Sequence, residues 1–204
     1  MTSITRSPAR CALVGMVAAV VLAGAAGCDH GDDVGNGGAG SAGGPSAAHG
    51  DDASAVETVT TLHSAGKKLD ASHRERVKTG VNEAIDAWFD GAFIGDFPRS
   101  DWSAAFTGFT KGAASDAQGR DLDLLTNAGL GDQIDSATAI RRRVRLNVFA
   151  AQGHPRGATA HVVLEFETSG GVSESMSVRG DLYLFKEKGQ WRIFGYDVDQ
   201  AVPL

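Results

Sequence analysis

Residues 181–198 read DLYLFKEKGQWRIFGYDV, and this stretch decides the fold. Leu182 and Leu184 lie two residues apart, and the polar break Lys188-Gly189 separates them from a Gly-x-Trp-x-Ile run. Alternation with period two is the pattern of a strand with one buried face, and a Gly in a short polar break is typical of a tight turn. The stretch therefore predicts a closing β-hairpin whose second strand covers Gln190–Val198.

Two further strands precede the hairpin. Apolar residues alternate with polar ones over Ile140–Ala150 and again from Ala160 to Glu167. His154–Gly157 and Ser169–Gly171 carry turn residues, and Gly180 predicts a bulge or a bend within the third strand. Four consecutive strands joined by short loops predict an antiparallel meander.

The spacing upstream is helical. Val56, Val59 and Leu62 form a short amphipathic pattern, and Ser72-His73-Arg74-Glu75 is a capping box that predicts the start of the longest helix. Positions three and four residues apart then form one apolar stripe on that helix. The stripe consists of Val77, Val81, Ala84, Ile85, Trp88 and Phe89.

Two shorter helices are predicted before the strands begin. One covers Trp102–Phe109, with Ser100 as its cap, and the other runs from about Ala114 to Leu125. Helices followed by a meander predict an α+β fold, with the helices packed on one face of a curved antiparallel sheet of four or more strands. Residues 56–204 have the size of one ordinary domain, and we predict that they form a single domain.

The element order and the closing hairpin resemble the nuclear transport factor 2-like superfamily, which includes ketosteroid isomerases and SnoaL-like cyclases. A cystatin-like sheet gives a similar pattern. The superfamily resemblance covers roughly Val56 to Val198. It implies a cone whose sheet and helices enclose a pocket, used for catalysis in some members and for binding in others. No catalytic acid of the superfamily matches a position in this chain.

A pocket in such a cone has few candidate residues. Asp86 and Asp90 lie one helical turn apart beside Trp88, and two carboxylates near an aromatic ring can act as acid and base. The alternative is a pair of solvated carboxylates on the polar face of the helix. Arg142 shares the parity of Val144, which predicts an inward side chain that pairs with an anionic ligand or with a helix carboxylate. The alternative is that the arginines around it protect an exposed strand from edge pairing.

Three polar residues of the last two strands complete the candidate pocket. Tyr183, Tyr196 and Asp197 either converge inside the cone to orient a ligand, or belong to an ordinary half-buried sheet surface. Residues 56–204 contain no cysteine and no linear metal, phosphate or dinucleotide motif. We therefore expect neither a metal site nor a cofactor.

The N-terminus carries an export signal. Met1–Arg10 has two arginines and no acid, Cys11–Gly27 has no charged residue, and LAGAAGC leads into Cys28. This order resembles a bacterial lipoprotein signal, which implies that residues 1–27 are removed and that Cys28 is lipidated. Two alternatives remain open, an ordinary secretory cleavage after Ala23-Gly24-Ala25 and an uncleaved membrane anchor. Each of the three places the rest of the chain outside the cytoplasm.

Residues 28–55 are predicted to be a flexible tether. They are dominated by Gly, Ala, Ser and Asp, a composition that cannot bury enough apolar surface to fold. A flexible tether of this length has an end-to-end distance of about 25–30 Å. Removal of the signal takes two of the 19 basic residues and none of the 25 acidic ones, so the net charge falls from −6 to −8. That charge disfavours nucleic acid as a partner.

The sequence therefore predicts a lipid-anchored protein on the extracytoplasmic face of the cell membrane. Its domain is expected to bind a small apolar ligand or an envelope protein, and a homodimer through the open sheet face fits such a fold. The alternative is a cofactor-independent isomerase, cyclase or hydrolase, and whether the chain is an enzyme stays open, with binding preferred. An enclosed cavity with two or more convergent ionisable groups favours chemistry, whereas a filled interior with an exposed apolar patch favours binding.

Overall fold

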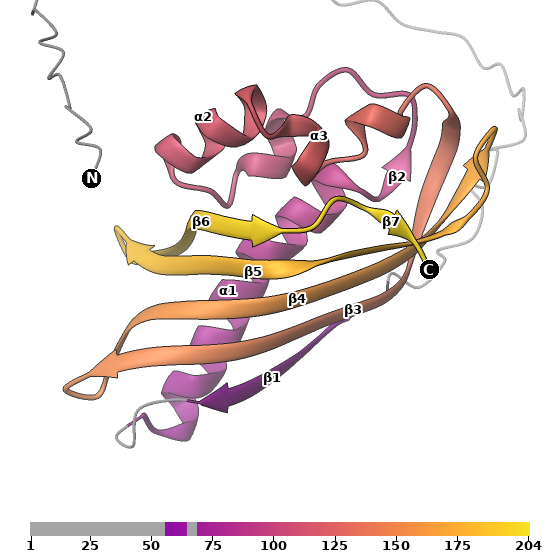
Figure 1. The fold of residues 1–204 in the computed structure, drawn as a ribbon. Coiled ribbons are helices and arrows are strands. Elements are labelled where there is room, and N and C mark those ends of the chain that lie inside the picture. The colour runs from indigo at the N-terminus through magenta and orange to yellow at the C-terminus, as the bar shows by residue number, and fades with distance from the viewer. Residues whose placement is uncertain (1–55, 65–68) are drawn as a thin grey trace, which may run out of the picture. The chain divides into compact units, whose positions relative to one another are not determined.

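The structure is a computed structural model that describes residues 56–64 and 69–204, all within one compact unit. The predicted signal at 1–27, Cys28 and the tether at 28–55 lie outside the described residues. The predicted α+β fold is confirmed, because the helices pack on an open and largely antiparallel sheet (Figure 1). None of the described helices has the length and apolarity needed to cross a membrane.

Four long strands form the predicted meander, and each is antiparallel to the next. A fifth strand, β1 (Thr58–Ser64), lies parallel to β3 at the edge of the sheet. Two short strands, β2 (Gly95–Asp96) and β7 (Val202–Pro203), pair with β3 and β5. The four strands of the meander are β3 (Ile134–Ala151), β4 (His154–Gly170), β5 (Ser175–Glu187) and β6 (Gln190–Val198).

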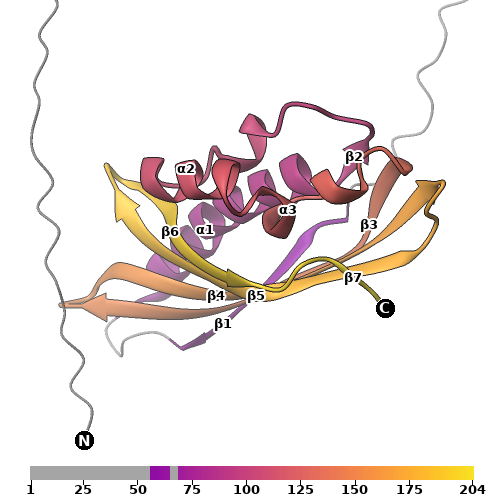
Figure 2. The ribbon, with the colours of Figure 1, turned by 45° about the horizontal axis from the view of Figure 1, so that its top comes forward.

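All the helices lie on one side of the sheet, which curves beneath them as Figure 2 shows. They are α1 (Ala71–Ala92), α2 (Lys111–Gly119) and α3 (Leu122–Leu125), with the short 3-10 helices η1 (Ser103–Phe106) and η2 (Ala128–Leu130). The predicted stripe on α1 is buried along its whole length. A sheet that is curved but not closed, with helices on its inner side, is consistent with a nuclear transport factor 2-like cone.

The first element is a strand, so the helical reading of Val56, Val59 and Leu62 is wrong. Side chains from Val56 to His63 alternate between half-buried and exposed, which is the period of a strand. Three threonines and two valines in this stretch, all β-branched, favour the extended backbone. Its parallel partner, Arg142–Asn147, is more than 80 residues away along the chain, so no local pattern predicts the pairing.

The cap of α1 is Asp70 and not Ser72. The Asp70 carboxylate accepts a hydrogen bond from the backbone N–H of His73 at 2.8 Å, and the Ser72 hydroxyl donates to the same carboxylate at 2.9 Å. Asp is as good an N-cap as Ser, and here it lies one residue before the helix begins. The hydrogen bonds from His73 and Ser72 hold the pKa of Asp70 well below its usual range.

Two other local predictions need correction. Trp102–Phe109 contains only the 3-10 helix η1, although the predicted apolar residues of this segment are buried. The turn between the first two meander strands lies at Gln152-Gly153, where both residues have positive φ, and not at 154–157. The last turn at Lys188-Gly189 is as predicted, with positive φ at both positions.

Gly180 marks a close approach between β5 and β6. A Cβ atom at this position would lie 2.4 Å from the carbonyl oxygen of Asp197, and the residue has a φ of +158°. The irregular register predicted near Gly180 lies instead between Tyr183 and Leu184, where Phe194 is the extra residue of β6. That extra residue sets which side chains of β6 face the helices.

Candidate functional site

The inner side of the sheet is filled by aromatic side chains. Trp88 is fully buried, and its ring centroid lies 5.4 Å from that of Phe93, which in turn lies 5.9 Å from that of Phe166. The indole N–H of Trp88 donates to the carbonyl of Leu125 at 2.9 Å. Trp88, predicted to line a pocket, is therefore placed in the core between α1 and the sheet.

The structure brings Asp86, Asp90 and Arg142 together at the side of α1 that faces β1 and β3. Nη2 of Arg142 lies 2.5 Å from Oδ1 of Asp90, and Nη1 lies 3.9 Å from Oδ1 of Asp86. The hydroxyl of Thr58 donates to Asp86 at 2.5 Å. Arg142 thus points inward and pairs with a helix carboxylate, one of the two alternatives that its parity left open. The ion pair joins β3 to α1, and both carboxylates have a partner.

Burial is the largest influence on the Asp86 carboxyl, and it raises the pKa above the ordinary value of 3.8. The hydrogen bond from Thr58 and the charge of Arg142 oppose that shift. Because the folded pKa is higher than the unfolded one, Asp86 favours the folded state at low pH. That contribution is lost as the pH rises from the unfolded value through the raised folded value.

We therefore predict that Asp86→Asn removes a pH dependence of stability. The free energy of unfolding of the wild type, relative to that of Asp86→Asn, will fall as the pH rises from 3.8 through the raised pKa. Urea unfolding between pH 3 and pH 7 measures the difference, with Glu187→Gln as the exposed carboxylate control. A difference that rises with pH would contradict the stated direction of the shift.

The three polar residues of the last strands do not converge. Tyr196 faces the helices, where its hydroxyl donates to Asp121 at 2.6 Å. Burial, followed by this hydrogen bond, raises the pKa of Tyr196 to about 12. Tyr183 and Asp197 lie on the opposite face, because Tyr183 alternates with the buried Leu182 and Leu184, and Asp197 is the neighbour of Tyr196 on its strand.

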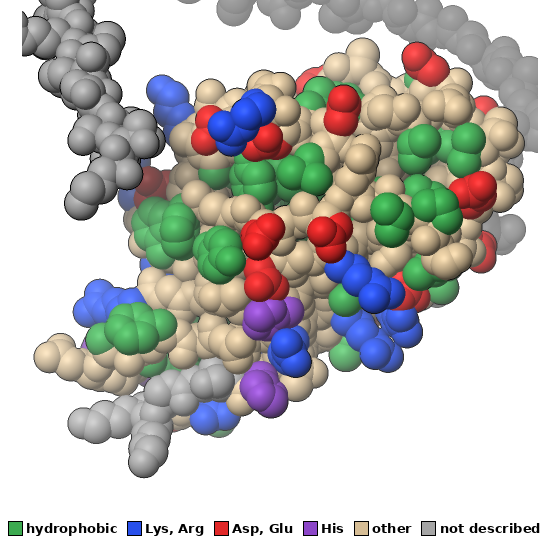
Figure 3. Space-filling view, viewed as in Figure 1, with side chains coloured by type: hydrophobic (Ala, Val, Ile, Leu, Met, Phe, Trp, Pro, Cys, Tyr) green, Lys and Arg blue, Asp and Glu red, His purple; other side chains and the backbone are tan. Residues whose placement is uncertain are grey.

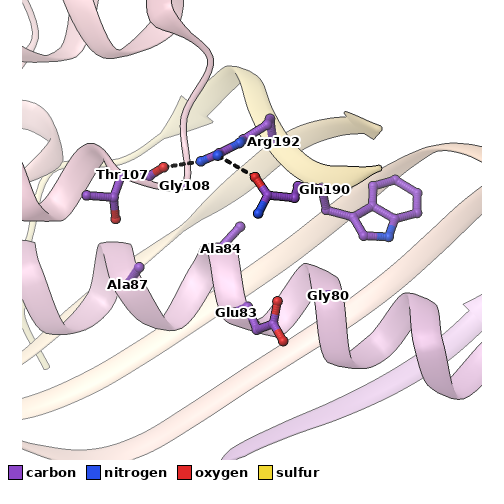
Figure 4. A pocket seen from close by; sticks show the side chains of 9 residues that line it. Gly80, Glu83, Ala84, Ala87, Thr107, Gly108, Gln190 and Arg192 are labelled. Carbon is purple, nitrogen blue, oxygen red and sulfur yellow. Dashed lines mark hydrogen bonds between the residues drawn. The ribbon is translucent and has the colours of Figure 1, made fainter. Parts of the chain in front are cut away.

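One groove lies between α1 and β6, with a volume of about 330 Å³ (Figure 4). Gly80, Ala84 and Ala87 of α1 form one wall, and Gln190 and Arg192 of β6 face them. Arg192 donates to the carbonyl of Thr107 and, at 2.6 Å, to the side-chain oxygen of Gln190. Its guanidinium is hydrogen-bonded to two neutral oxygens, and the exposed Glu83 adds a carboxylate to the same groove.

The outer face of the sheet, which the helices leave uncovered, carries a second groove of about 360 Å³. Small residues of β4, Gly157, Ala158 and Thr159, form its floor. Four aromatic side chains flank that floor, and we call the whole the aromatic groove. They are Phe149 on β3, Tyr183 and Phe185 on β5, and Phe194 on β6.

The aromatic groove is open to water along its length. Phe149 is 67% exposed and Phe194 is 52% exposed, and the Phe194 ring lies 5.4 Å from that of Phe185. Arg156 lines the same groove, whereas its lining includes no carboxylate. Large exposed aromatic residues that gather in one place are typical of a binding surface.

A hydrogen-bonded chain of polar side chains adjoins the groove. Nε2 of His161 lies 2.9 Å from Nδ2 of Asn147, and Nδ1 lies 2.5 Å from Oδ1 of Asp181. With Asn147 donating, His161 accepts at Nε2 and donates at Nδ1, so the neutral ring is held in one tautomer. No Ser or Cys nucleophile is among the partners of His161 in the described residues. Asn147, His161 and Asp181 therefore form an ordered polar surface beside the groove.

Figure 3 shows hydrophobic side chains toward both ends of the visible face, with acidic side chains and histidine in the middle and a group of basic side chains beside them. The strand register gives the rows of the outer face. Phe149 pairs with Gly157, Arg145 pairs with His161 and Asp181 follows, and Arg143 shares a row with Arg179.

The sequence analysis did not single out the aromatic groove. The signal was present for Phe149, which has the parity of Arg143, Arg145 and Asn147 on the polar side of its strand. An aromatic residue in a row of exposed polar positions is a sign of a binding surface. No signal was present for Phe194, because its direction depends on the irregular register of β6.

No protein-family model matches the chain, and no similar sequence is found among curated proteins.

Proposed function

We propose that this chain is a lipid-anchored protein on the extracytoplasmic face of a bacterial cell membrane, and that it binds a protein partner through the aromatic groove. One observation carries the binding role. Beneath α1 the inner side of the sheet is filled by the core, and a groove of about 420 Å³ remains beside α3 and β7. The outer side carries four aromatic residues around a floor of small residues, and two of the four are more than half exposed. A filled interior with an exposed apolar patch favours binding over chemistry.

The ionisable groups also favour binding over catalysis. Asp90 is paired with Arg142 and Asp86 accepts a hydrogen bond from Thr58, so both residues of the predicted acid–base pair have a structural partner. Tyr196, predicted to orient a ligand, is hydrogen-bonded to Asp121. Tyr183 and Asp197 lie on the other face of the sheet. General acid–base catalysis needs such groups within reach of one substrate, and here they are divided between two surfaces.

The open shape of the groove favours a protein over a small molecule. A small-molecule site buries most of its ligand, whereas this groove leaves one long side open to water. A protein partner covers that side with its own surface and inserts one apolar side chain between the aromatic walls. Arg156, with no carboxylate in the lining, favours an acidic residue next to that apolar side chain.

The anchor rests on the sequence around Cys28. LAGAAGC follows an uncharged run, and residues 28–55 supply a tether that spans about 25–30 Å. Such a tether holds the domain clear of the headgroups and leaves the groove free to meet a partner in the envelope. A nuclear transport factor 2-like cone accords with the element order and the open sheet.

The binding role is tested by removing two aromatic walls. Full-length chain carrying Phe149→Ser and Phe194→Ser is produced in bacterial cells, and the proteins retained from solubilised membranes are compared with those retained by the wild type. Val202→Ser with Leu204→Ser is the matched control, because these residues are 52% and 62% exposed and line a different groove. We expect a partner retained by the wild type and by the control but lost with the groove variant. Retention of the same proteins by all three chains would contradict the proposal.

A further inference from the structure

The groove of about 420 Å³ beside α3 and β7 has a partly apolar lining, and we call it the α3–β7 groove. Its buried and half-buried apolar side chains come from η2, from the β4–β5 turn, from β5 and from the residues before β7. They are Leu130, Val172, Met176 and Ala201. A volume of this size is sufficient for a small molecule. The α3–β7 groove shares no lining residue with the aromatic groove, so it is a separate site.

Asn127 lines the α3–β7 groove and carries a buried acceptor without a donor. The residue is 1% exposed, and its Nδ2 donates to the carbonyl of Phe93 at 3.0 Å, which identifies the nitrogen end of the amide. Among the side chains of residues 56–64 and 69–204, Oδ1 of Asn127 is the sole buried oxygen that lacks a hydrogen-bond partner. A buried acceptor of this kind is destabilising unless a donor reaches it. A ligand in the groove is able to supply that donor.

The other buried polar side chain of the groove is already satisfied. The hydroxyl of Thr126 donates to the carbonyl of Leu122 at 2.7 Å and accepts from the backbone N–H of Ala128 at 3.1 Å. A hydroxyl has one hydrogen to donate, so Thr126 has no donor left for a ligand. The buried part of the lining therefore offers a ligand an acceptor, at Asn127, and no side-chain donor.

The charges around the groove favour a cation. Asp123 and Glu174 line it with exposed carboxylates, and its described lining contains no Lys, Arg or His. Helix α1 ends at Ala92, whose carbonyl accepts from the backbone N–H of Asn127 at 3.1 Å, and the C-terminal end of a helix carries a negative partial charge. The described residues hold no group of three His, Cys, Asp or Glu side chains suited to a metal ion. An organic cation therefore fits this lining better than a metal ion does.

We infer that the α3–β7 groove binds a small organic cation that has a primary ammonium group and a short apolar chain. The ammonium group donates to Oδ1 of Asn127 and is attracted by the carboxylates of Asp123 and Glu174, while the apolar chain packs against Met176 and Leu130. A primary ammonium has three N–H donors, whereas a quaternary ammonium carries the same charge and has none. The site is thus expected to distinguish these two kinds of cation.

Calorimetric titration of the full-length chain in a neutral detergent tests the ligand class. The probes are n-butylammonium, butyltrimethylammonium, n-butanol and butyrate, which share one apolar chain and differ in the polar group. We expect n-butylammonium to bind at least about tenfold more tightly than each of the other three, because it alone combines positive charge with N–H donors. No binding of n-butylammonium, or equal affinity for butyltrimethylammonium, butanol or butyrate, would overturn the inference.

Charge-neutralising variants place the site. Asp123→Asn with Glu174→Gln should weaken the binding of n-butylammonium about tenfold, because both carboxylates that attract the cation are lost. Glu167→Gln with Glu187→Gln is the matched control, since it removes two exposed carboxylates outside the groove and should leave the affinity unchanged. Equal affinities of the two double variants would contradict binding in this groove.

The contribution of Asn127 is tested by the ligands and not by a substitution. Asn127 also holds the end of α1 through Phe93, so its replacement would disturb the fold. The comparison of n-butylammonium with butyltrimethylammonium removes the donors from the ligand and leaves the protein unchanged. Phe149→Ser with Phe194→Ser leaves the lining of the α3–β7 groove intact, so failure of the aromatic-groove proposal would not affect this result.

Discussion

Replacement of Cys28 with serine will abolish the attachment of lipid to this chain and will release it from membranes. In the lipoprotein reading, the acyl chains are joined to the Cys28 thiol through a thioether, and serine has no sulfur to form that bond. Each buried methylene of an acyl chain contributes about 0.8 kcal/mol to membrane binding, so the loss of two chains leaves no comparable anchor. Radiolabelled palmitate in a bacterial host measures the attachment, and sedimentation with membranes measures the release.

Cys11→Ser is the matched control for this experiment. Cys11 lies inside the segment that is predicted to be removed, so its replacement should leave both the label and the membrane fraction unchanged. No label in the wild type would contradict lipidation at Cys28. Mass spectrometry of the N-terminus would then separate a secreted chain that begins near Ala26 from an uncleaved anchor.

Replacement of Trp88 with alanine will remove about 3–5 kcal/mol from the free energy of unfolding. Trp88 is fully buried against Phe89 and Phe93, and its removal leaves a large cavity between α1 and the sheet. The carbonyl of Leu125 also loses its hydrogen-bond donor. Since a domain of this size is stable by about 5–15 kcal/mol, this loss is a large fraction of its stability.

The control for Trp88→Ala is Phe194→Ala on the outer face. Phe194 is 52% exposed, so its replacement should change the free energy of unfolding by less than about 0.5 kcal/mol. Urea unfolding of both variants measures the two differences. If the two variants were equally stable, the assignment of Trp88 to the core and of Phe194 to the surface would be wrong.

The meander was predictable because its information is local. Each strand carries its own alternation, and the short turns leave little choice of partner, as the Lys188-Gly189 hairpin shows. Strand β1 was not predictable in the same way. Val56, Val59 and Leu62 fit a helical spacing, and only the pairing with distant β3 selects the strand.

The candidate site, too, was predictable only where the information is local. Parity alone predicted that Arg142 points inward, and the structure pairs it with Asp90, which is 52 residues away. The separation of Tyr183 from Tyr196 depends on Phe194, the extra residue that shifts the register of β6. A one-residue shift turns every later side chain to the other face, and nothing in the sequence locates that shift.

Photocrosslinking from the aromatic groove in living cells tests the central claim most directly. A photoreactive amino acid at position 194 of the full-length chain should form an adduct with one envelope protein, the same one that Phe149→Ser with Phe194→Ser fails to retain. The same probe at position 202, which is equally exposed but outside the groove, should form no adduct with that protein. An adduct of equal yield from position 202, or none from position 194, would contradict a binding role for the aromatic groove.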